Sequence, residues 1–167
     1  VKEVVPALAG RLQDGEPGVQ KAAIASLSWI GPAAAPAVPA LLALLRDERK
    51  PCFEQVLSCL GDIGPEAAEA VPRLREILAD PRHVRARGIV AGTLGAIGPA
   101  AVDAVPDLCA LLEDKEWAVR KAAAWALGRI GPAAKGALLR LRARLSDEHE
   151  PVRREARVAI DLIEEKD

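Results

Sequence analysis

The sequence predicts an all-α protein, an α-solenoid of ten helices arranged as five antiparallel hairpins. The tripeptide Ile-Gly-Pro occurs four times, at spacings of 33, 34 and 33 residues, and begins at Ile30, Ile63, Ile97 and Ile130. The dipeptide Val-Pro recurs in the same register, and begins at Val5, Val38, Val71 and Val105. Repetition at a fixed period of about 20–50 residues is typical of stacked repeat proteins, so the period predicts the fold class.

Each repeat unit divides into two segments, and a recurring aspartate follows the first. This residue is Asp14, Asp47, Asp80, Asp114 or Asp147, and Leu138-Leu139 takes the place of Val-Pro in the fifth unit. We expect a single array over residues 1–167, with units of approximately 1–33, 34–66, 67–100, 101–133 and 134–167.

The first segment of each unit is predicted to be a helix that starts at Val-Pro. In the second unit, apolar residues fall at Val38, Leu41, Leu42 and Leu45, which places them on one face of a helix. Proline is tolerated at a helix start, because its missing N–H would have no partner there.

The second segment of each unit is predicted to be a helix that ends at Ile-Gly-Pro. In the fourth unit, Val119, Ala123, Leu127 and Ile130 share one helical face. Glycine tolerates the left-handed conformation found at helix ends, and proline cannot continue the hydrogen-bond ladder. Gly-Pro therefore predicts a stop.

The two ends of the chain differ from the middle. From Pro151 onward the last helix lacks the Gly-Pro stop and carries many charges, as expected for a unit that caps a solenoid against water. Gly10 and Gly15 weaken the first helix, which has no comparable polar cap. We therefore expect residues 1–14 to be the least protected in hydrogen exchange, and the N-terminal face to be able to pair with a second copy. Because it begins at Val1 without an initiator methionine, the chain is expected to be a fragment or a processed form.

The fourth unit carries the most specific pattern. Asp114 is followed by Val119-Arg120 and then by Ala-Ala-Ala-Trp-Ala-Leu-Gly-Arg-Ile-Gly, which ends at Gly131. This pattern resembles the HEAT repeat in its bacterial phycobilisome-lyase-like form, and the resemblance covers essentially the whole chain. It implies five HEAT-like hairpins. It does not carry the bilin chemistry of the lyase, because no catalytic residue of that activity maps onto this chain and the repeat serves many unrelated roles.

The resemblance further implies a ladder in which aspartates and arginines link neighbouring units. Successive units place at the arginine position Gln20, Phe53, Arg87, Arg120 and Arg153. We therefore expect the ladder to be broken at its N-terminal end.

Composition excludes several functions. The chain has 23 basic and 24 acidic residues and a net charge of −1, so no overall field attracts nucleic acid or an anionic membrane. No apolar run approaches the ~20 residues that a membrane span needs. Cys52, Cys59 and Cys109 show no metal-ligand pairing, and we expect buried free thiols in a reducing, cytoplasmic setting.

Catalytic motifs are absent from the sequence. There is no nucleophile elbow, no phosphate-cradling glycine loop and no His-Glu-x-x-His. His149-Glu150 matches the His-Glu pair of the HEAT-repeat di-iron hydroxylases, but that centre needs several such pairs and this chain has one. We expect a non-enzymatic protein with no cofactor and no metal.

The concave face, which the second helices are expected to line, is the predicted binding surface for a protein partner. Its candidate residues are Lys21, Glu54, Ser58, Gly88, Gly92, Trp117, Lys121, Trp125 and Arg154. One hypothesis is a shallow cleft, with Gly88 and Gly92 as its floor and the two tryptophans as its walls, because exposed tryptophan is the most enriched binding anchor. The plainer interpretation is that Trp125 lies across Gly92 and the glycines only make room.

A second candidate site is a basic cluster at a predicted helix start, where free N–H groups favour anions. It consists of Arg82, His83, Arg85 and Arg87. Without a net positive charge, a solvated face is the better interpretation, and nucleic acid is an unfavoured partner. The sequence thus predicts a scaffold that binds a protein. The alternatives are an isolated or engineered array with no native ligand, and a nucleic-acid or phosphate-binding module.

Overall fold

The computed structural model describes residues 3–46 and 52–164, and in these ranges it contains ten α-helices and five 3-10 helices. The first helices of the hairpins are α1 (Val4–Arg11), α3 (Val38–Leu44), α5 (Val71–Ala79), α7 (Val105–Leu111) and α9 (Leu138–Arg144). The second helices are α2 (Pro17–Ile30), α4 (Phe53–Ile63), α6 (Arg87–Ile97), α8 (Trp117–Ile130) and α10 (Glu150–Glu164). The predicted all-α repeat solenoid is confirmed. Asp47, one of the recurring aspartates, lies outside the described residues.

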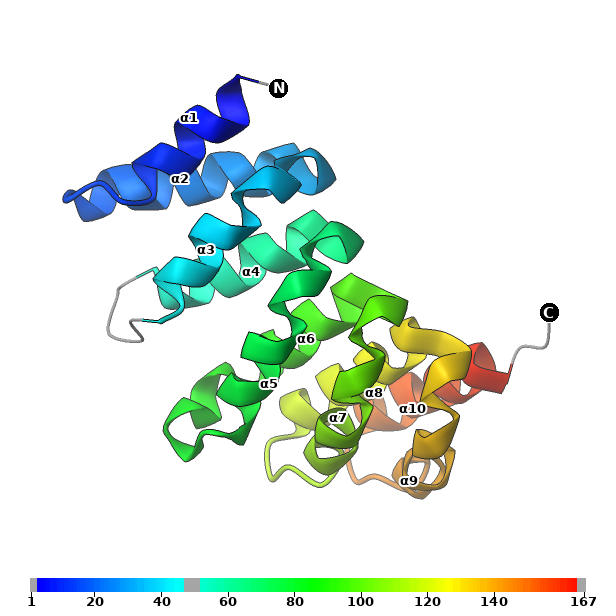
Figure 1. Cartoon of the computed structure of the whole chain (residues 1–167). Helices are drawn as coiled ribbons and strands as arrows, with labels where there is room; N and C mark the ends of the chain where they lie inside the picture. The colour runs from blue at the N-terminus through cyan, green and yellow to red at the C-terminus, as the bar shows by residue number, and fades with distance from the viewer. Residues whose placement is uncertain (1–2, 47–51, 165–167) are drawn as a thin grey trace.

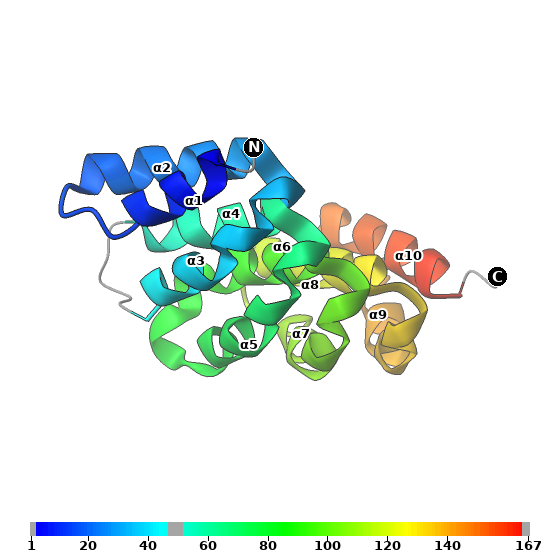
Figure 2. The ribbon, with the colours of Figure 1, turned by 45° about the horizontal axis from the view of Figure 1, so that its top comes forward.

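The helices form two layers that run the length of the solenoid (Figures 1 and 2). In one layer α2, α4, α6, α8 and α10 pack side by side, each against the next. The odd-numbered helices form the other layer and touch one another much less. The layer of even-numbered helices is the one expected to be concave, and we refer to it below as the concave side.

The junction between units turns at a glycine. Gly31, Gly64, Gly98 and Gly131 have φ between 64° and 75°, a left-handed conformation that disfavours any residue with a Cβ. Each glycine ends one α-helix and begins a 3-10 helix, which runs into the next α-helix. These 3-10 helices are η1 (Gly31–Ala37), η2 (Gly64–Ala70), η4 (Gly98–Ala104) and η5 (Gly131–Ala137). The sequence predicted that each helix stops at Gly-Pro. The α-helix does end there, and the chain changes direction and continues as a 3-10 helix.

Equivalent positions of successive units supply the core. One leucine of each of the first four concave helices is fully buried: Leu27, Leu60, Leu94 and Leu127. Each of the four junction helices buries an alanine completely: Ala34, Ala67, Ala101 and Ala134. Small residues at these places let the 3-10 helices pack directly on one another, which sets the distance between units.

Two continuous helical stretches, Pro17–Leu44 and Pro81–Leu111, are long and apolar enough to cross a membrane by length and composition. The expectation that no apolar run approaches that length is therefore wrong. Each stretch nevertheless changes direction at a junction glycine, Gly31 or Gly98, and buries part of its apolar surface in the core. In the structure each stretch consists of two α-helices of the solenoid joined by a 3-10 helix.

The arginine ladder forms in the C-terminal units. Arg87 Nη1 donates to Asp114 Oδ2 at 2.9 Å. Arg120 donates from Nε and Nη2 to the two carboxylate oxygens of Asp147, at 2.8 Å each. Arg153, which no further described unit follows, donates to the backbone carbonyls of Asp147 and Glu148. The ladder therefore joins the third unit to the fourth and the fourth to the fifth.

Other contacts replace the ladder at the N-terminal end. Gln20 donates to the backbone carbonyl of Asp14, in the way that Arg120 donates to the carbonyl of Asp114. Phe53 stacks on His83 of the third unit, with ring centroids 5.1 Å apart. The junction between the second and third units thus carries an aromatic contact where later junctions carry an ion pair.

Candidate functional site

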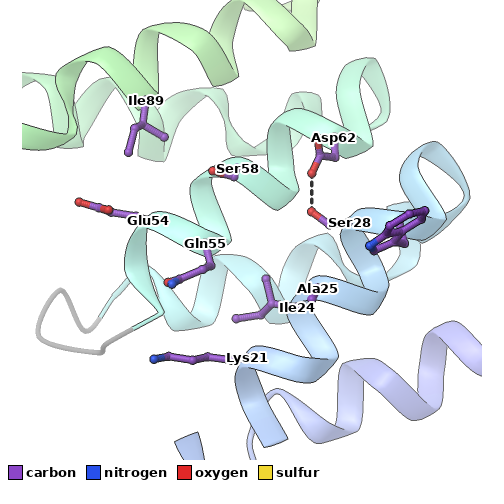
Figure 3. Close-up of a pocket in the computed structure, with 10 residues that line it drawn as sticks. Lys21, Ile24, Ala25, Ser28, Glu54, Gln55, Ser58, Asp62 and Ile89 are labelled. Atoms are coloured by element: carbon purple, nitrogen blue, oxygen red, sulfur yellow. Dashed lines mark hydrogen bonds between the residues drawn. The ribbon is translucent and has the colours of Figure 1, made fainter. Parts of the chain in front are cut away.

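A groove of about 740 Å³ lies on the concave side, between α2 and α4, and reaches α6 (Figure 3). From α2 it is lined by Lys21, Ile24, Ala25, Ser28 and Trp29. From α4 it is lined by Glu54, Gln55, Ser58 and Asp62, and Ile89 of α6 closes it. Of the predicted binding residues, the structure brings Lys21, Glu54 and Ser58 together here.

Two rows of side chains, each spaced by four residues, form the rims of the groove. Residues four apart lie on the same face of a helix, one turn above the other. On α2 the row is Lys21, Ala25 and Trp29, and on α4 it is Glu54, Ser58 and Asp62. All six residues are exposed. The α4 rim is therefore polar, the α2 rim combines Lys21 with an alanine and a tryptophan, and the floor includes the buried side chain of Ile24.

A hydrogen bond joins the two rims near the helix C-termini. The Ser28 hydroxyl donates to Asp62 Oδ2, which fixes the carboxylate against α2 (Figure 3). Cys59 is buried, and desolvation raises the pKa of its thiol to about 11. Because a thiolate and not a thiol is the nucleophile, Cys59 is a packing residue.

Trp29 is the functional candidate that the sequence analysis missed. Its side chain is 89% exposed, more than twice as much as Trp117 (40%) or Trp125 (37%). The signal was present in the spacing, because Trp29 continues by one turn the row that begins with Lys21 and Ala25. Trp117 and Trp125 were predicted instead, because the expected helix stack places them beside the glycines of the third unit.

The predicted cleft at Trp125 has a different geometry from the one expected. A Cβ on Gly95 would lie only 2.5 Å from the Trp125 ring, whereas a Cβ on Gly92 would meet nothing within 4 Å. Trp125 therefore packs on Gly95, and neither Gly92 nor Gly88 is under its ring. A Cβ on Gly88 would meet Val119 at an ordinary 3.8 Å.

Trp117, the other predicted wall, stacks on His149 of the fifth unit, with ring centroids 5.7 Å apart. The remaining predicted residues also lie toward the C-terminal end, with Lys121 half-buried on α8 and Arg154 exposed on α10. These positions are separate from the groove between α2 and α4.

The predicted anion site is occupied by internal contacts. Its residues begin in η3 (Pro81–Ala86), a short 3-10 helix ahead of α6. Arg82 pairs with Asp80, and Arg87 pairs with Asp114. Hydrogen bonds from Arg82 hold the pKa of Asp80 at about 2. His83 stacks on Phe53, and Arg85 is exposed. The four side chains therefore do not gather around one site.

Metal ligands are not assembled in the described part of the chain. There, no three His, Cys, Asp or Glu side chains are grouped so that they could hold a metal ion. His149, from the His-Glu pair, lies near the carboxylates of Asp147 and Glu148 and beside Arg120. Arg120 already neutralises Asp147, so this cluster is part of the ladder.

Comparison with known proteins places the chain in a family. The family model described as HEAT repeats matches residues 1–51 and 82–161. No curated protein matches the chain by sequence. Among solved structures, an engineered protein is 24% identical with a TM-score of 0.76, over 98% of this chain and 80% of its own.

Two further structures share the fold. The complex of CpcE and CpcF of phycocyanin lyase from Nostoc is 23% identical, with a TM-score of 0.69, over 95% of this chain and 99% of the matched chain. A computationally designed armadillo repeat protein for modular peptide recognition is 20% identical, with a TM-score of 0.70, over 96% and 82% of the two chains. The family match covers most of the sequence, and the chain belongs to the HEAT repeat family.

Proposed function

We propose that this chain is a non-enzymatic scaffold that binds a protein partner in the groove between α2 and α4. The observation that carries the proposal is Trp29, which lines the groove and is 89% exposed. Tryptophan, tyrosine and arginine dominate the energetics of protein interfaces. A tryptophan that is so exposed contributes little to the packing of its own chain. A partner that covers its side chain would explain its position.

The fold supports the same proposal. Helical repeat solenoids offer an extended concave surface for binding. The Nostoc lyase structure is a complex of two chains, and the designed armadillo repeat protein is described as made for peptide recognition. With the scaffold we propose a cytoplasmic setting, since all three cysteines are buried and Cys59 and Cys109 are free thiols.

Affinity capture from a lysate of the source cell tests the proposal. The bait is the wild-type chain, Trp29→Ala, or the double variant Trp117→Ala/Trp125→Ala, at low and high salt. Leu139→Ala is the matched control, because Leu139 is 80% exposed on the other layer. We expect a protein partner that survives high salt and is reduced roughly 30-fold or more in affinity by Trp29→Ala, as for a hot-spot residue.

The other outcomes separate the alternatives. Loss of the partner only in the Trp117/Trp125 double variant would move the site to the C-terminal end of the concave face. Nucleic acid that is recovered at low salt and lost at high salt would favour a phosphate-binding module. Capture of nothing would favour an isolated array without a native ligand.

Self-association through the N-terminal face is a separate proposal. Val4 of α1 is 50% exposed, and within the described part of α1 only Val5 is buried. Sedimentation of the wild type and of Val4→Lys over a concentration series tests it, and a monomer at every concentration would end it.

A further inference from the structure

We propose that the end of the groove at Trp29 and Asp62 binds the guanidinium group of an arginine in an extended segment of the partner. This inference rests on the proposed function and adds the chemistry of the partner. It follows from three independent features of the same end of the groove: a carboxylate, an aromatic face and the polarity of two helix ends.

The carboxylate is exposed and held in place. Asp62 Oδ2 accepts the hydroxyl of Ser28, and Oδ1 accepts no hydrogen bond from the described residues. Asp62 has no ion-pair partner among those residues, unlike Asp80, Asp114 and Asp147, each of which pairs with an arginine. An oriented carboxylate with an open oxygen is suited to the planar fork of a guanidinium.

The aromatic side chain lines the same groove as the carboxylate. Trp29 follows Ser28 directly and lines the same groove as Asp62. The face of an indole attracts a cation, and arginine stacks on such a face more often than lysine does. A guanidinium placed there can stack on Trp29 while its N–H groups reach Asp62.

The helix ends add negative potential and lack a cation. Trp29 and Asp62 are the penultimate residues of α2 and α4, and neither helix has a basic residue in its last turn. Cations are favoured near helix C-termini, where carbonyl groups carry partial negative charge. In the fourth unit the equivalent residue is Arg129, so that unit supplies its own cation. The third unit also lacks a basic residue here and has Ala96 at this position, so among the first four units an aromatic or acidic side chain stands there only in the first two.

The rest of the groove indicates a peptide and not a small free cation. Beyond the Trp29–Asp62 end, Ile24 and Ile89 provide apolar surface, and Lys21 and Glu54 form a second polar end. A small ammonium ion would occupy one end only. An extended segment with an arginine followed by an apolar residue matches the sequence of surfaces along the groove.

Selection from a library of random displayed dodecapeptides tests the inference on the full chain. The targets are the wild type, Trp29→Ala and Asp62→Asn. Leu139→Ala and Glu66→Gln are the matched controls, since both residues are exposed and lie outside the groove. We expect arginine to be enriched in peptides selected on the wild type and on both controls, and the enrichment to disappear on the two groove variants. Replacing that arginine by citrulline, its neutral isostere, should weaken binding roughly fivefold or more.

Each of four results would overturn the inference, and the first three concern the selected peptides. They are selected peptides without arginine enrichment, equal binding of the citrulline and arginine peptides, and equal binding of these peptides to wild type and Asp62→Asn. A failure to select any peptide would also overturn it. None of these results removes the proposed function, which fails only if the lysate experiment gives no protein partner that depends on Trp29. Circular dichroism of each variant confirms that the fold is retained, as expected for two exposed side chains.

Discussion

The two ends of the solenoid place their charged and aromatic side chains in different environments. In the C-terminal half, Arg120 is 7% exposed and binds both oxygens of Asp147, and Trp125 packs on Gly95. In the N-terminal half, Asp62 has no ion-pair partner among the described residues and Trp29 is 89% exposed. In the C-terminal half the ion pairs of the ladder join the units. In the N-terminal half the Ser28–Asp62 hydrogen bond and the Phe53–His83 stack do so, and Asp62 and Trp29 remain exposed.

This difference indicates that a repeat protein can divide stability and binding between its two halves. The repeat positions that fill the core are the same in both halves, so the halves differ in the side chains that lie outside the core. Side chains that are not needed to join units are free to bind, and sites that bind are commonly not optimised for stability. We therefore expect mutations in the C-terminal half to act on stability, and mutations of the groove residues to act on binding.

The largest expected effect comes from breaking the buried ion pair. Arg120→Ala leaves the carboxylate of Asp147 buried without its partner, and we expect a loss of roughly 3–5 kcal/mol in the free energy of unfolding. Chemical denaturation measures it. Arg82→Ala is the control, since Arg82 is 71% exposed and should matter far less. Equal losses in the two variants would contradict the distinction between the halves.

A pair of glycines gives the next largest effect, and the sign of the effect differs between them. Gly95→Ala places a Cβ 2.8 Å from the Ala126 backbone, so we expect a loss of roughly 1–3 kcal/mol. Gly92→Ala meets nothing within 4 Å, and the higher helix propensity of alanine should stabilise the protein by roughly 0.5–1 kcal/mol. Thermal unfolding of the two variants checks both signs. Destabilisation by Gly92→Ala would mean that other atoms occupy the space into which the new Cβ would project.

Acid should weaken the C-terminal half through Asp147. Hydrogen bonds from Arg120 hold the pKa of Asp147 at about 2, below its ordinary value of 3.8. A lowered folded-state pKa contributes stability above pH ~3.8 that is lost as pH falls toward 2, and we expect about 1 kcal/mol to be lost between pH 5 and pH 3. We expect urea denaturation across this range to show that the free energy of unfolding changes less steeply with pH in Asp147→Asn than in the wild type. An unchanged slope would mean that Asp147 does not carry the effect.

The smallest expected effect is local and concerns the first helix. In the described part of the chain, α1 buries Val5 alone, whereas α8 buries eight residues. Amides of α1 should therefore exchange faster than amides of α8, as local opening does not require unfolding of the array. Hydrogen exchange followed by mass spectrometry measures the difference. Comparable protection of the two helices would indicate that another surface covers α1.

The period of the sequence was sufficient to predict the fold, because the repeated residues are those that pack. The buried leucines and the glycines of the junctions recur at the repeat spacing, and each has one physical role. The 3-10 helices after the glycines were not predicted, since proline and alanine are compatible with several backbone forms. The two long apolar stretches were also missed, because the sequence analysis treated Gly-Pro as an end and counted each helix alone.

The site was harder to predict, because it depends on which side chains remain unpartnered. Lys21, Glu54 and Ser58 were found from helical position, and the structure places all three at the groove. The sequence could not tell that Trp125 packs on Gly95 while Trp29 packs on almost nothing. That distinction arises from contacts between neighbouring units.

We propose that the partner binds the groove on α2 and α4. The most direct test is nuclear magnetic resonance of the labelled chain titrated with a peptide selected on the wild type. The three tryptophan indole N–H signals, assigned by single Trp→Phe variants, report on the two halves separately. We predict that the Trp29 indole and the amides of α2 and α4 shift, while the Trp117 and Trp125 indoles stay in place. Shifts that gather on α8 and α10, with Trp29 unaffected, would contradict the claim.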